Sequence, residues 1–201
     1  MTEVAVPKRV RHKFTWIEML ISSIISLTAS LVLSIDAWKL AGNPDTELGC
    51  NISATISCGK VAEAWQSTLL GFPNAFLGLM AEPVVITLAV ASLAGVVFPK
   101  LLIRLALYVY GIGFGFAYWL FYQSYFNIGA LCPWCLTVTV TTTTVFITMF
   151  RVAVLDDVIL QGKRTKVFGE KVKTALGYNA DSAVAAILIA VIVSAILSKY
   201  L

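Results

Sequence analysis

The sequence predicts an all-α integral membrane protein with five transmembrane helices. Of its 201 residues, 59% are hydrophobic and only 13% are charged, and the mean hydropathy is +0.86. Soluble domains carry about 25% charged residues, so this composition excludes the soluble globular class. The hydrophobic residues also gather in blocks that are long enough to cross a ~30 Å hydrocarbon core.

The first two predicted spans are separated by a polar loop. Residues 19–35 carry no charge and form the first span. This apolar stretch is too long for a cleaved signal peptide, and no clear small-x-small cleavage site follows it. Residues 73–98 form the second span, interrupted only by Glu82 and Pro83. Glu82 would lie near the bilayer centre, where we expect a hydrogen-bonded structural role, with proton donation as the alternative. The loop, 41–72, is expected to contain a short amphipathic helix.

The remaining hydrophobic residues predict three more spans. Residues 105–150 contain no charged side chain, and at about 1.5 Å per residue one helix of that length would exceed two bilayer cores. This block must therefore fold back, and Asn127 and Gly129 place the reversal within 123–130. Residues 183–198 make the fifth span.

The positions of the lysines and arginines predict the orientation in a cell membrane. Of the 15 lysines and arginines, all but three lie before the first span, between spans two and three, or between spans four and five. The three exceptions are Lys39, Lys60 and Lys199. The positive-inside rule then places the N-terminus in the cytoplasm and the loop 41–72 outside. The net charge of +4 is explained by this topology, so we expect no nucleic-acid partner. Near the outer end of span one, Asp36 and Lys39 are expected to form an interfacial pair.

The four cysteines form two pairs on the predicted outer side. Cys50 and Cys58 lie in the loop, and Cys132 and Cys135 open the fourth span. A Cys-x-x-Cys pair that begins a helix favours thiol–disulfide chemistry, because the helix N-terminus stabilises a thiolate. Pro133 suits the first helical turn, where no backbone N–H is needed. Disulfides persist outside the cytoplasm, so the two pairs suggest an electron relay.

Other uses of these cysteines are weighed against the relay. A structural zinc site needs four ligands at close spacing, but the only histidine, His12, is on the cytoplasmic side and seven residues separate Cys50 from Cys58. We therefore expect no metal. A non-catalytic membrane protein, such as a small transporter or assembly factor with structural disulfides, stays an alternative. So does a carrier that moves reducing equivalents outward, although it requires cysteines reachable from the cytoplasm.

In combination, these motifs resemble the vitamin K epoxide reductase family over residues 16–152. The resemblance rests on Cys50, Ile56-Ser57-Cys58, Gly71-Phe72-Pro73-Asn74 with Gly78, and Cys132-Pro133-Trp134-Cys135. It implies a four-helix transmembrane bundle around a quinone, followed here by a fifth transmembrane helix. It also implies a quinone-dependent, disulfide-forming oxidoreductase, which takes electrons from an extracytoplasmic thioredoxin-fold protein and reduces membrane quinone.

The resemblance also implies a role for each cysteine. Cys132 and Cys135 would be the active-site pair beside the quinone, with Cys135 facing the ring. Cys132 would accept electrons from Cys58 through a mixed disulfide, and Cys50 would exchange with the external partner. The expected resting pairs are Cys50–Cys58 and Cys132–Cys135, with a trapped Cys58–Cys132 bond as an alternative.

Three further residues bear on the quinone site. Asn74 matches the family's quinone-contacting asparagine, with a cap of span two as the alternative. Trp65 is expected to cap the quinone pocket or to anchor the loop at the interface. Some animal members carry a tyrosine where this chain has Thr139, whose hydroxyl reaches less far, so we expect ordinary quinone reduction and do not extend the expectation to vitamin K epoxide.

The predicted organisation has four parts. They are a cytoplasmic basic tail (1–15), a four-helix catalytic membrane domain with an external loop (16–152, loop 41–72), a cytoplasmic linker (153–182) and a fifth transmembrane helix (183–201).

Overall fold

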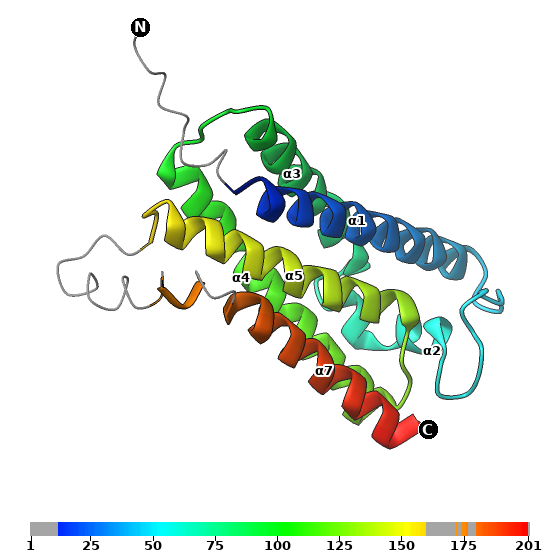
Figure 1. Cartoon of the computed structure of the whole chain (residues 1–201). Coiled ribbons are helices and arrows are strands. Elements are labelled where there is room, and N and C mark those ends of the chain that lie inside the picture. The colour runs from blue at the N-terminus through cyan, green and yellow to red at the C-terminus, as the bar shows by residue number, and fades with distance from the viewer. Residues whose placement is uncertain (1–11, 160–171, 173, 177–179, 201) are drawn as a thin grey trace, which may run out of the picture. The chain divides into compact units, whose positions relative to one another are not determined.

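The structure, a computed structural model, describes residues 12–159, 172, 174–176 and 180–200. Five long helices dominate it (Figure 1): α1 (Lys13–Gly42), α3 (Ala75–Leu93), α4 (Lys100–Tyr122), α5 (Pro133–Leu155) and α7 (Ala180–Tyr200). Each contains a stretch that is long and apolar enough to cross a membrane, which confirms the prediction of an all-α protein with five spans. Residues 1–11 of the predicted basic tail and most of the predicted linker lie outside the described residues, and the last residues of the predicted tail, from Lys13, already belong to α1.

Three short helical segments lie in the connections before α3 and before α5. A helix α2 (Cys58–Glu63) and a 3-10 turn η2 (Trp65–Thr68) lie in the loop between α1 and α3. A π-helical turn η3 (Gln123–Ile128) follows α4, where the reversal was predicted. Gly129 ends it at φ 67°, a left-handed conformation that glycine adopts without steric cost. Helix α5 then begins at Pro133, as predicted from the missing backbone N–H of proline.

The chain forms two compact units. One contains Met1–Ile21, Val85–Gly111 and Thr143–Leu201; the other contains Ser22–Val84 and Ile112–Thr142. The second unit carries all four cysteines and is called the cysteine unit below. The first is called the core unit.

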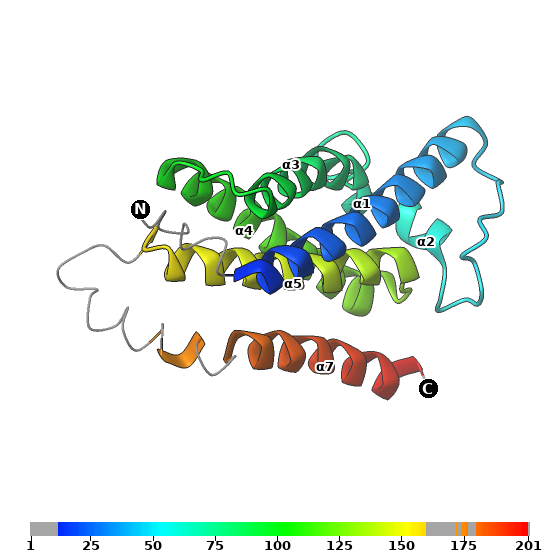
Figure 2. The same ribbon diagram turned by 45° about the horizontal axis from the view of Figure 1, so that its top comes forward.

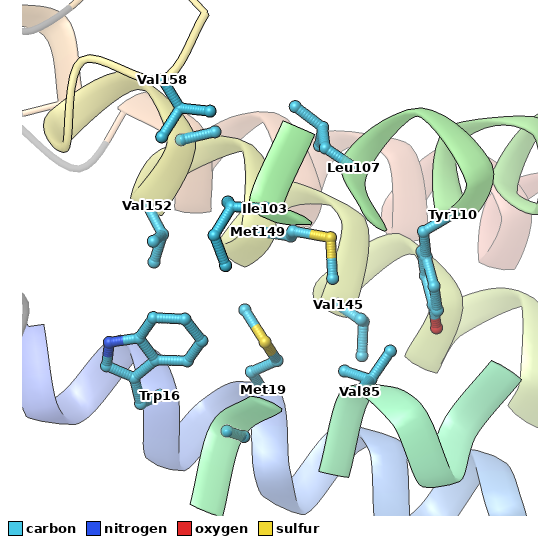
Figure 3. Packing of buried hydrophobic residues seen from close by; sticks show 12 residues of the cluster. Trp16, Met19, Val85, Ile103, Leu107, Tyr110, Val145, Met149, Val152 and Val158 are labelled. Atoms are coloured by element: carbon cyan, nitrogen blue, oxygen red, sulfur yellow. The ribbon is translucent and has the colours of Figure 1, made fainter. Parts of the chain in front are cut away.

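The core unit is held together by a continuous cluster of buried apolar side chains (Figure 3). Trp16 and Met19 of α1 meet residues from three other helices: Val85, Ala89, Ile103, Leu107, Tyr110, Val145, Met149 and Val152. Polar bonds close the end of α5, because Lys100 and Arg104 of α4 donate to the carbonyl oxygens of Asp157 and Val158 at 3.2 Å. These two carbonyl groups lie in the turn that follows α5, which ends at Leu155, so the two cations attach this turn to α4.

An ion pair ties α7 to α5 within the core unit. The Arg151 guanidinium lies 3.1 and 3.0 Å from the two carboxylate oxygens of Asp181, and Asp181 is only 8% exposed. Most of α7 is otherwise exposed and apolar, as at Ile187 and Val191, which suits a helix surrounded by lipid. The pair is therefore a specific polar attachment of α7 within this unit.

Breaking this pair is expected to destabilise the packing of α7. The change Asp181→Asn removes the carboxylate that faces the partly buried Arg151 guanidinium, and the loss of such a charge-assisted contact costs about 1–3 kcal/mol. Thermal or denaturant unfolding in detergent measures the loss, and the exposed Asp45→Asn serves as the matched control. The double variant Arg151→Gln/Asp181→Asn leaves neither charge and should recover part of the stability. An Asp181→Asn protein as stable as the parent would contradict this role.

Candidate functional site

The cysteine unit gathers its cysteines into one buried cluster. Its buried members are Leu48, Cys50, Cys58, Val61, Ala130 and Cys132, and partly buried neighbours include Leu33 and Leu40 of α1 and Trp134 and Cys135 of α5. Both ribbon views place α2 beside the first turn of α5 (Figures 1 and 2). Segments far apart in sequence thus supply one site.

A short backbone bridge aligns the two cysteine segments. Ile56 and Leu131 form an isolated parallel β-bridge, in which Leu131 N–H donates to Thr55 O at 2.8 Å and Ser57 N–H donates to Leu131 O at 3.0 Å. Cys132 follows Leu131 directly and Cys58 stands two residues after Ile56, so the bridge brings the two cysteines next to each other. Such main-chain bonds position a site more rigidly than side-chain packing alone.

The first turn of α2 is fixed by polar side chains. Ser57 is its N-cap and accepts the Lys60 N–H at 3.2 Å, an interaction that satisfies one of the open donors of the helix. The Asn51 side-chain oxygen accepts the Gly59 N–H and the Ser57 hydroxyl, both at 3.0 Å. A buried Cys58 therefore opens α2 in a defined orientation.

The two cysteine pairs are in different redox states. Cys50 and Cys58 form a disulfide, as expected, whereas Cys132 and Cys135 are free thiols rather than the expected second disulfide. The site is therefore shown with its loop pair oxidised and its helix pair reduced.

The contact between the pairs has the geometry of disulfide exchange. Cys132 Sγ lies 3.2 Å from Cys58 Sγ, and the two residues are 1% and 2% exposed. Reacting atoms in a near-attack arrangement are about 3–3.5 Å apart. This sulfur–sulfur contact joins residues that are 74 positions apart in sequence.

The start of α5 favours a thiolate on Cys132. The Cys135 N–H points at Cys132 Sγ from 3.4 Å, and hydrogen bonding by the Cys135 thiol is the main reason that the pKa of Cys132 is lowered, with burial opposing it. A lowered pKa increases the thiolate fraction at neutral pH, and the thiolate is the attacking species in exchange.

Asn74 does not cap the second span, so this alternative is wrong. Helix α3 begins at Ala75, but the Asn74 side-chain nitrogen donates to Gln66 O at 2.6 Å. Its Oδ1 atom is buried and accepts no hydrogen bond from the described residues. A buried amide oxygen without a donor is costly, which favours a ligand contact over a purely structural role.

Two glutamines that the sequence reasoning did not single out extend this polar region. Gln66 is buried at 6% exposure, and its amide nitrogen lies 3.4 Å from Gln123 Oε1. Asn127 donates to the same oxygen. Gln123 stands at the predicted reversal, which was the only signal that could have drawn attention to it.

Trp65 and Thr139 are placed in the same unit. Trp65 is 63% exposed and meets the edge of Trp119 with ring centroids 6.4 Å apart. The Thr139 hydroxyl donates to Cys135 O at 2.9 Å along its own helix. That bond uses the hydroxyl's single proton within α5.

Comparison with known proteins gives one match. A search of curated proteins returned none, but the family model described as "Vitamin K epoxide reductase family" matches residues 17–150. The match covers more than half of the chain, runs from the first turns of α1 to the last turns of α5, and includes all four cysteines. Members of this family carry out disulfide chemistry in membranes and work with quinones. This chain therefore belongs to the vitamin K epoxide reductase family and is a membrane redox protein.

Proposed function

We propose that this protein is a quinone-dependent thiol–disulfide oxidoreductase. It takes electrons from an extracytoplasmic thioredoxin-fold protein and delivers them to membrane quinone, and thereby supports disulfide formation in secreted proteins. The observation that carries the proposal is the 3.2 Å contact between the Cys132 thiol and the Cys58 sulfur of a disulfide. A non-catalytic protein with two structural disulfides has no use for a free thiol in that position.

The first exchange takes electrons from the partner. A partner thiolate attacks Cys50 Sγ, and Cys58 leaves as a thiolate. The second thiol of the partner then attacks the mixed disulfide and releases Cys50. The partner loses two electrons and gains a disulfide, while the loop pair becomes a dithiol.

The second exchange moves these electrons to the helix pair. The Cys58 thiolate attacks Cys132 Sγ of a Cys132–Cys135 disulfide, and Cys135 leaves. Cys50 then attacks Cys58 Sγ, and Cys132 leaves as a thiolate beside the Cys135 N–H. The products are an oxidised loop pair and a reduced helix pair, which are the states seen in the structure.

The polar and aromatic residues of the cysteine unit fit a quinone. Asn74 has a buried Oδ1 without a donor among the described residues and an amide proton beyond the one given to Gln66 O, so it can accept from a hydroxyl or donate to a carbonyl. Trp65 and Trp119 add aromatic surface. We assign Asn74 and Trp65 to quinone binding. The bound quinone supplies a two-electron acceptor that returns Cys132 and Cys135 to a disulfide.

The orientation supports the choice of partner. The positive-inside rule places Cys50 and Cys58 outside the cytoplasm, where dithiol partners await oxidation. The partner that we propose on that side is a thioredoxin-fold protein.

The test is oxidation of a reduced thioredoxin-fold protein by the purified chain, with and without added quinone. We expect turnover that requires quinone and falls to background in Cys135→Ala, because the helix pair can no longer form a disulfide. Leu136→Ala, which removes more volume from the same turn but no sulfur, should retain turnover. A well-folded parent protein that oxidises no partner with any quinone would reject the proposal and favour the non-catalytic alternative.

A further inference from the structure

An acidic side chain of α1 lies against the reacting sulfur of the loop pair. Asp36 Oδ2 is 3.9 Å from Cys50 Sγ, and the two residues are 9% and 8% exposed. A disulfide sulfur carries no proton, so no hydrogen bond joins these atoms in the oxidised state. Once Cys50 is reduced, its S–H faces a carboxylate oxygen at hydrogen-bonding reach for sulfur.

The carboxylate is oriented by its surroundings. Leu33 and Leu40 pack against the cysteine cluster, and Asp36 lies between them on the same face of α1, at the i, i+3 and i+7 spacing of a helix. Lys39 Nζ lies 3.9 Å from Oδ1, as expected for the interfacial pair. The two oxygens thus have separate partners, and Oδ2 is the one directed to Cys50.

The charge of Asp36 also reaches the helix pair. The titratable groups that face it in the described part of the chain are Lys39 on its own helix, Cys50 in the loop, and Cys132, whose thiolate it disfavours. Burial of a carboxylate costs free energy unless the group is paired and hydrogen-bonded. The ion pair with the exposed Lys39 provides a partner for Oδ1 only.

We propose that Asp36 is the acid–base residue for Cys50 in exchange between the loop pair and Cys132; this rests on the proposed function. In the Cys58–Cys132 mixed disulfide, the Cys50 S–H bond breaks and its proton moves to Asp36 Oδ2. The Cys50–Cys58 bond forms as the Cys58–Cys132 bond breaks, and Cys132 leaves with the electron pair. The proton then passes to water. Cys50 is oxidised and Cys132 reduced, so the step needs no further oxidant.

The proposal predicts a specific dependence on pH. Below an ordinary thiol pKa of about 8.5, Cys50 is protonated and needs a base. General-base assistance commonly contributes at least 10²-fold, and a carboxylate is a weak base for a thiol, so Asp36→Asn should slow resolution about 10- to 100-fold at about pH 6. At about pH 9 the thiol ionises in water unaided, and the variant should match the parent.

The experiment follows the mixed disulfide itself. Fully reduced protein in detergent receives one equivalent of diamide, is quenched with acid at intervals, and is alkylated for peptide mass spectrometry. We expect Cys58–Cys132 to accumulate and decay slowly in Asp36→Asn at the lower pH only. Asp36→Glu should retain most of the parental rate, and the exposed Asp45→Asn should behave as the parent.

The alternatives predict other results. If the Cys58–Cys132 disulfide of Asp36→Asn decays at the parental rate at the lower pH, or is slowed equally at every pH, the proposal is overturned in favour of a structural ion pair. Lys39→Gln keeps the carboxylate and is expected to keep the parental pH dependence; if it reproduces Asp36→Asn, the proposal also fails. Quinone is not needed in this assay. A parent that resolves the mixed disulfide normally but never reduces quinone would refute the proposed function and leave the role of Asp36 intact.

Discussion

Cys58 and Cys132 are expected to form a single disulfide rapidly and completely in a Cys50→Ala/Cys135→Ala variant. Their sulfurs lie 3.2 Å apart, in a buried cluster aligned by the bridge between Ile56 and Leu131. Preorganised groups react with very high effective concentrations, because little orientational freedom has to be lost. The measurement is the rate of bond formation with diamide, read by mass spectrometry of unreduced peptides.

The matched control exchanges one loop cysteine for the other. Cys58→Ala/Cys135→Ala retains Cys50 and Cys132, and we expect its disulfide to form at least about 100-fold more slowly, because the structure places Cys58 and not Cys50 against Cys132. Equal rates in the two variants would show that the loop presents either sulfur to α5. The proposed order of transfer would then be wrong.

The second large effect is expected at Gly78, where α1 and α3 approach closely within the cysteine unit. A Cβ atom at this position would lie 2.1 Å from Ser30 Oγ and 2.8 Å from Ser30 Cβ, and Ser30 is buried. Gly78→Ala should therefore destabilise the protein by about 1–3 kcal/mol through overpacking. Unfolding in detergent measures the change.

Two further variants separate this contact from helix propensity. Gly113→Ala, at a helical glycine with no atom within 4 Å of the added Cβ, should keep or gain stability, since alanine favours a helix by about 1 kcal/mol. The double variant Gly78→Ala/Ser30→Gly moves the small residue to the other helix and should recover most of the stability lost in Gly78→Ala. If the double variant is no more stable than Gly78→Ala, the contact with Ser30 is not the cause.

The spans were predictable because the bilayer imposes a length and a polarity on each helix. The reversal after Tyr122 and the start of α5 at Pro133 also depend on local chemistry, namely a glycine with positive φ and an imino acid without an N–H. These properties act over a few residues, so sequence patterns report them directly. The pairing of Cys50 with Cys58, eight positions apart, was expected from the resemblance to the family.

Other features depended on contacts between distant segments. The sequence alone left Asn74 equally suited to a helix cap, and only the position of Gln66 O showed that its amide turns away from α3. The sequence alone also indicated no role for Asp36 other than a pair with Lys39. The second contact, to Cys50 Sγ, exists because a loop returns to the end of α1.

The sequence by itself determined the class of protein, the number of spans, the reversal between α4 and α5, and the chemistry of a helix-starting cysteine pair, because hydropathy, charge and turn propensity are local properties. Only the tertiary structure decided which sulfur meets which, where Gly78 is required and what faces Asn74 and Asp36. Those outcomes depend on distances between atoms far apart in the chain, and a one-dimensional pattern does not contain them.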